Sequence, residues 1–131
     1  MFFIYNYSNF PIVNVTLNGY INNDEEFKLF TNEWLKIYEK KSDFQFIFDT
    51  KNLLGSNIKY TFYMACFIKH LKQLNYSYLK SSKIYLYNNY LYNFAKIIFY
   101  FEKPIAPIEL ILYNNDNNII SNEIINPISN N

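Results

Sequence analysis

The segment DFQFIFD (residues 43–49) decides the fold. Phe44, Phe46 and Phe48 occupy alternate positions, so their side chains point to one face of an extended strand. Ile47 lies on the opposite face, which gives that face apolar character as well. A strand with most of both faces covered is typical of the centre of a parallel sheet. The segment therefore predicts a central strand.

Helical patterns lie on both sides of this strand. Asn23 and Glu26 form a capping-box pattern that predicts the start of a helix. Apolar residues then recur at three- and four-residue intervals, which indicates one buried helix face: Phe27, Phe30, Trp34, Ile37 and Tyr38. Similar stripes predict helices over residues 57–74 and 91–101, the second ending before Pro104.

Extended segments account for most of the remaining chain. They are expected at residues 2–7, 11–17, 82–87 and 108–112, and the first two form a hairpin. The order ββαβαβαβ predicts a single α/β domain with about three helices and a mostly parallel mixed sheet of four to five strands. We place this domain at residues 1–115 and expect residues 116–131 to be an Asn-rich, partly disordered tail.

Composition argues against several function classes. The 131-residue chain has a formal charge of +1, and all its basic residues are Lys, so electrostatic capture of nucleic acid is not expected. Heavy use of Asn, Ile, Lys and Tyr indicates an AT-rich genome. The single Cys66 excludes an internal disulfide and favours the cytoplasm. No apolar stretch is long enough for a membrane span, and no phosphate-binding loop motif occurs.

Three segments, taken with the element order, resemble the STAS domains of anti-sigma-factor antagonists and the SpoIIAA-like proteins. LNGYI (residues 17–21) resembles the strand that ends in Gly before the first helix of that family. FIFD (residues 46–49) resembles its central strand, and LLGSN (residues 53–57) occupies the place of its regulatory Ser or Thr loop. The similarity covers roughly residues 10–112.

A second similarity involves Trp34, Tyr38, Ser56 and Lys59, whose arrangement resembles related bacterial regulatory phosphoproteins. Together the resemblances imply a non-catalytic regulatory module without cofactor or metal, which docks a kinase-like or other regulatory protein. They make Ser56 a candidate phosphoacceptor. The docking surface implied at the start of the second helix comprises Asp49, Asn52, Gly55, Ser56, Asn57 and Lys59.

Each candidate residue also has a purely structural interpretation. Ser56 or Asn57 can cap the second helix, and Asp49 can cap a loop. Cys66 and His70 are four residues apart on one helix, which suits two metal ligands or a nucleophile and base. A buried structural cysteine and a solvated histidine are the ordinary interpretation.

The residues alone are also compatible with two other functions. One is a structural or virus-encoded scaffold subunit that self-associates through its aromatic surface. The other is a binder of a small apolar ligand, with a pocket beside the second helix.

Overall fold

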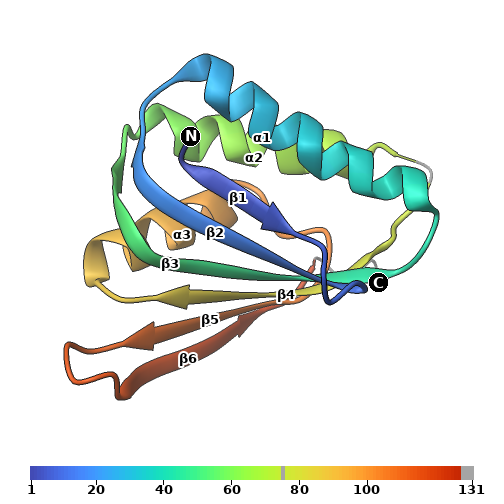
Figure 1. Ribbon diagram of the computed structural model, residues 1–131. Coiled ribbons are helices and arrows are strands. Elements are labelled where there is room, and N and C mark those ends of the chain that lie inside the picture. Colours follow the sequence, from blue (N-terminus) through green and yellow to red (C-terminus); the bar gives the residue numbers. More distant parts are fainter. Residues whose placement is uncertain (75, 128–131) are drawn as a thin grey trace.

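The computed structural model describes residues 1–74 and 76–127. Within them it contains three α-helices and one six-stranded mixed sheet (Figure 1), which confirms the α/β class. The elements are β1 (Phe3–Asn6), β2 (Ile12–Ile21), α1 (Asp24–Ile37), the short 3-10 helix η1 (Tyr38–Lys40), β3 (Phe44–Ser56), α2 (Lys59–Lys72), β4 (Leu79–Leu86), α3 (Asn89–Phe101), β5 (Ile108–Tyr113) and β6 (Ile119–Ile125).

The strands lie in the sheet in their chain order, from β1 to β6. β2, β3, β4 and β5 are parallel, whereas β1 and β6 pair antiparallel at the two edges. All three helices cover one face of the sheet and leave the other face bare (Figure 1). The expected N-terminal hairpin and mostly parallel sheet are both confirmed.

The number of strands and the end of the central strand differ from the sequence-based prediction. The expected sheet of four to five strands has six, because residues 119–125 form β6 and pair with β5. This strand lies in the segment that we expected to be a tail beyond a domain of residues 1–115, and residues 128–131 of that tail lie outside the described part of the chain. Residues 50–55, which follow the strand predicted at residues 43–49, continue β3, because their backbone pairs with the end of β2 between Asn18 and Tyr20.

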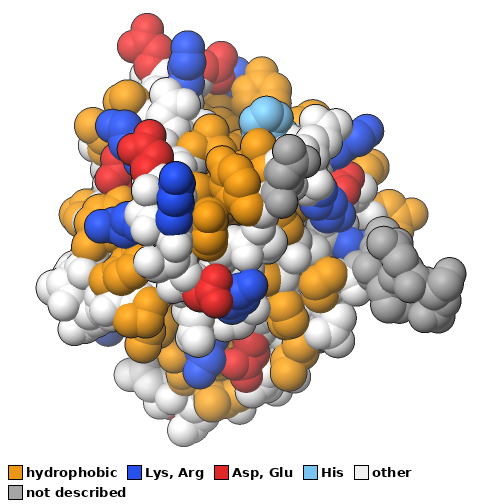
Figure 2. All heavy atoms as spheres, turned by 90° about the vertical axis from the view of Figure 1, so that its right-hand side faces the viewer, with side chains coloured by type: hydrophobic (Ala, Val, Ile, Leu, Met, Phe, Trp, Pro, Cys, Tyr) orange, Lys and Arg blue, Asp and Glu red, His pale blue; other side chains and the backbone are white. Residues whose placement is uncertain are grey.

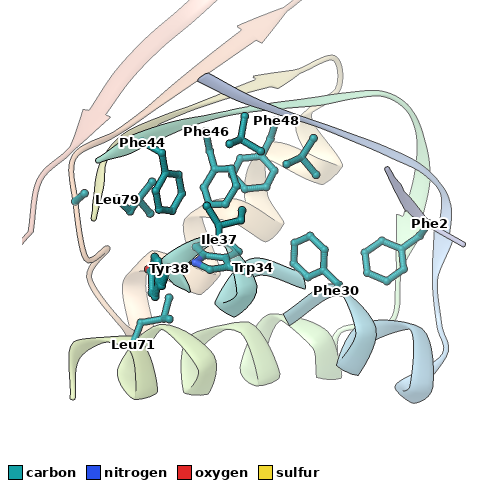
Figure 3. Close-up of a cluster of buried hydrophobic side chains, with 13 residues drawn as sticks. Phe2, Phe30, Trp34, Ile37, Tyr38, Phe44, Phe46, Phe48, Leu71 and Leu79 are labelled. Carbon is teal, nitrogen blue, oxygen red and sulfur yellow. Dashed lines mark hydrogen bonds between the residues drawn. The ribbon is translucent and has the colours of Figure 1, made fainter. Parts of the chain in front are cut away.

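The core is a layer of aromatic rings between α1 and β3. The ring of Trp34 lies 4.6 Å from that of Phe46 and 5.3 Å from that of Phe67 of α2, measured between centroids. Figure 3 shows Trp34 pointing from α1 toward the β3 phenylalanines, as its place in the apolar stripe predicts. The cap of α1 is also confirmed, since Asn23 Oδ1 accepts a 2.9 Å hydrogen bond from the Glu26 N–H.

Tyrosine hydroxyls attach the N-terminal hairpin to α1. The Tyr5 hydroxyl donates to the Phe30 carbonyl at 2.8 Å, and the Tyr7 hydroxyl donates to the Glu33 carboxylate. The Tyr5 ring also packs against Phe30. Edge strand β1 is therefore held by helix contacts as well as by its pairing with β2.

The aromatic layer predicts a large difference between core and surface aromatic substitutions. Phe46 is 1% exposed, so Phe46→Ala should lower the free energy of unfolding by about 3–5 kcal/mol through lost burial and the cavity left behind. Tyr100 is 81% exposed, and Tyr100→Ala should change the same quantity by less than about 0.5 kcal/mol. Urea denaturation of both variants measures this, and equal losses would contradict the arrangement.

Candidate functional site

The site residues expected around Ser56 lie at the carboxyl ends of β2 and β3, at the left of Figure 1. Tyr20 pairs with Gly55 across the two strands. The rings of Tyr20 and Tyr90 approach to 3.5 and 3.7 Å of the position that a Cβ on Gly55 would occupy. The Tyr90 hydroxyl also lies 3.4 Å from the Ser56 carbonyl oxygen, to which it donates. Two tyrosines from distant parts of the chain therefore flank the segment.

Large apolar side chains around Ser56 are unusually exposed. The exposed fractions of Tyr20, Leu54, Ile58 and Tyr90 are 59%, 65%, 52% and 53%. We call these four residues with Gly55 and Ser56 the carboxyl-end surface. Single exposed apolar residues are normal, but several gathered at one end of a parallel sheet are typical of a binding surface.

The expectation that Ser56 caps α2 is wrong, because the N-cap position is occupied by Ile58, which makes no side-chain capping bond. Asn57 Oδ1 accepts a 3.1 Å hydrogen bond from the Lys59 N–H, whereas the Ser56 hydroxyl donates to the Asn57 carbonyl oxygen at 3.0 Å. Because Ser56 is the last residue of β3, its side chain precedes the helix. The next two N–H groups, those of Tyr60 and Thr61, are also bonded to carbonyl oxygens. A phosphate on Ser56 would compete with these bonds.

A polar network joins the starts of α1 and α2. The Tyr60 hydroxyl donates to Asp24 Oδ1 at 2.8 Å, and Lys59 Nζ lies 3.1 Å from the same oxygen. These contacts, first the Tyr60 hydrogen bond and then that of Lys59, hold the pKa of Asp24 below its usual range. Burial and the bond to Asp24 raise the pKa of Tyr60. Lys59, expected as a docking residue, thus has a structural role as well.

Two expected site residues lie elsewhere. Asp49 is in the middle of β3, on the bare face of the sheet opposite Phe48, and its carboxylate accepts the Lys51 N–H at 2.9 Å. Asn52 is exposed within the same strand, where it pairs with Asn18. The strand end that the sequence placed at Asp49 lies seven residues later at Ser56, so Asp49 is outside the carboxyl-end surface.

The bare face near Asp49 carries a cluster of tyrosines. The rings of Tyr87 and Tyr113 stack at 5.3 Å, and Tyr85 lies 6.0 Å from Tyr113. Burial raises the pKa of Tyr87, and the negative charge of Asp49 contributes to the shift. Asp49 therefore belongs to this cluster.

Cys66 and His70 both lie on the exposed side of α2, so the expectation of a buried cysteine is wrong. The buried side of α2 is instead formed by Tyr60, Thr61, Ala65, Ile68 and Leu71. Figure 2 shows the face at the amino ends of the parallel strands, with acidic and basic side chains interspersed and the single His at the surface. Within residues 1–74 and 76–127, no group of three or more His, Cys, Asp or Glu side chains could hold a metal ion.

An apolar cavity of about 170 Å³, partly open to the surface, lies between the sheet and the helix layer. Its wall includes Phe48, Met64, Ile84 and Ala95, and no charged residue.

The chain matches no family model, no curated protein and no solved structure. None of the helices in the described part of the chain has the length and apolar character needed to cross a lipid bilayer.

Sequence reasoning missed the four exposed apolar residues of the carboxyl-end surface. Tyr20 and Tyr90 are each 35 positions from Gly55 in the sequence. Tyr20 reaches it through the pairing of β2 with β3 and Tyr90 reaches it from α3, so local patterns could not place them beside it. Leu54 did carry a signal. It follows Leu53 directly, and a strand that buries one of two adjacent leucines must expose the other.

The polar network predicts a measurable titration. Because Tyr60 stabilises the ionised Asp24, Tyr60→Phe should raise the pKa of Asp24 toward that of a free aspartate. The network is complete above the lowered pKa and is lost as the pH falls through it. Carbon NMR titration of the Asp24 carboxyl measures the change, with Tyr63→Phe as the control that should leave it in place. Equal pKa values in all three proteins would rule out the Tyr60 contact.

Proposed function

We propose that this chain is a non-catalytic, STAS-like domain that docks a regulatory protein through the carboxyl-end surface. The observation that carries the proposal is the exposure of Tyr20, Leu54, Ile58 and Tyr90 around Ser56. An apolar centre with aromatic anchors is what a stable protein contact requires. The Tyr20 hydroxyl can donate to a carbonyl or carboxylate oxygen of the partner, and Lys59 Nζ has further protons to donate beside its contact with Asp24.

The element order supports the STAS-like assignment. A hairpin, followed by strands and helices in strict alternation up to β5, is the order on which the resemblance rests. The segment that resembles the regulatory loop of that family includes Gly55 and Ser56, which lie within the carboxyl-end surface.

Ser56 is the proposed switch. A phosphate adds about 1.5 to 2 negative charges. On Ser56 it would stand among four exposed apolar side chains, where a bound partner would have to remove its water. Phosphorylation is therefore proposed to release the partner by making the surface costly to desolvate, and not by binding at the helix start.

Matched substitutions test the docking surface. Ser56→Asp and Leu54→Asp should lower the amount of partner captured from native host cells at least tenfold, whereas Ser56→Ala should retain it. Leu29→Asp, on an exposed position of α1, is the control for a new charge elsewhere. Quantitative mass spectrometry of the captured protein, followed by calorimetry with the purified partner, gives the readout. Capture that is equal for all four variants would refute this surface.

A second candidate function, self-association, is favoured by edge strand β6. Among residues 1–74 and 76–127, β6 pairs only with β5, so its other edge is a template for a further strand. The segment ISNEI (residues 120–124) is nearly symmetric about Asn122, and Ile120 and Ile124 are each 61% exposed. Antiparallel pairing with a second copy centred on Asn122 would place Ile120 against Ile124 at both ends.

The charges of β6 are compatible with such pairing. Glu123 would face Ser121 of the second copy and not another acid. Its carboxylate is already held within the chain, because it accepts from the Tyr92 hydroxyl and from Lys96. Beyond this segment the register of β5 and β6 shifts between Leu112 and Tyr113, so the regular ladder ends near Ile120.

Light scattering tests the pairing of β6. The wild-type protein should have twice the 15.9 kDa chain mass, and Ile124→Lys should halve the measured value. Ile4→Lys, which adds the same charge on the opposite edge strand at 58% exposure, should leave the mass doubled. A wild-type monomer would remove this function, and loss of the dimer in both variants would point to another surface.

A further inference from the structure

The cavity between the sheet and the helices is too large to be a packing defect of the ordinary kind. Natural cores are packed as densely as organic crystals, with few voids larger than one water molecule. A water needs a space of about 10–15 Å³ by the same kind of measure. The 170 Å³ here exceeds that roughly tenfold, in a chain of 131 residues.

Water is a poor occupant of this space. A buried water needs two to four polar partners. The buried polar side chains on the cavity wall are Thr50, Thr61 and Ser82. Thr50 donates its hydroxyl to the Tyr85 carbonyl at 2.8 Å, and Thr61 donates to the Ile58 carbonyl at 2.6 Å. Two of these three hydroxyl groups therefore already donate their protons within the protein. The remaining residues of the wall are apolar except for Ser56 and Tyr60.

The wall also defines the chemistry of a ligand. Its side chains come from the sheet, including Phe48 and Ile84, and from the helices, including Met64 and Ala95. Since none of the lining residues is charged, an ionised group would lose its hydration without gaining a counter-charge. Ser82 adds one hydroxyl that can orient a single polar atom. The volume is close to that of an engineered cavity of about 150 Å³ that binds benzene.

We propose that this cavity is a binding site for a small, uncharged apolar molecule, about the size of one or two fused rings or a short alkyl chain. The ligand fills the space between β3, β4 and the helices α2 and α3, and it restores the contacts that the unfilled wall lacks. This proposal goes beyond partner docking and the pairing of β6. Ser56 and Leu53 line the cavity from the side of the carboxyl-end surface, so the two sites share a wall.

Thermal unfolding with two matched probes tests the site. Toluene at millimolar concentration should raise the melting temperature by several degrees, because a ligand that binds only the folded state stabilises it. Benzoate has nearly the same ring but carries a charge, and it should produce no shift. Equal effects of the two probes, or no effect of either, would overturn the proposal.

A substitution that fills the cavity provides a second test of the site. Ala95 lies on the wall and is 7% exposed, so Ala95→Leu places three more carbon atoms in the cavity. This variant should melt at a higher temperature than the wild type and should lose the toluene shift. A lower melting temperature would show that no space exists beside Ala95. If the variant does not fold, methyl NMR of the wild type decides: toluene should move the signals of Ile84 and Met64 but not that of Ile4, and unchanged signals would refute the site.

Discussion

The contact between Trp34 and the phenylalanines of β3 is the interaction on which the rest of the structure depends. It joins the first helix to the central strand, and Phe67 brings the second helix to the same ring. Right-handed crossovers between strands laid in chain order bring the helices to one face of the sheet, and this contact holds α1 and α2 against it. Once the helices take that face, the cavity, the carboxyl-end surface and the bare face all follow from the same layering.

Elements with strong local signals could be predicted from the sequence. The alternation of Phe44, Phe46 and Phe48 and the cap at Asn23 act over a few residues, so they identify β3 and α1 without knowledge of the neighbours. β6 could not be found this way. Its isoleucines lie in an Asn-rich segment, and only pairing with β5 makes them a strand.

In the candidate site, too, local signals were predictable and long-range contacts were not. Ser56, Asn57 and Lys59 do lie together at the start of α2, because they are adjacent in the chain. Asp49 was misplaced because Asn52 and Gly55 are turn-forming residues, and pairing with β2 overrides that preference and extends β3. The exposure of Cys66 depends on how α2 is rotated about its axis. A helix with two apolar stripes does not reveal which one faces the sheet.

Three tyrosines connect parts of this fold that a chain with arginine could join by ion pairs. Tyr7 binds Glu33, Tyr60 binds Asp24, and Tyr92 binds Glu123. A phenol is an uncharged donor. Dissolved ions, which weaken the attraction between opposite charges, therefore weaken these hydrogen bonds only slightly. Strong alkali is different. It removes the phenolic proton and leaves two negative groups in contact at each junction, so the hairpin, the helix starts and the β6 edge would all loosen together.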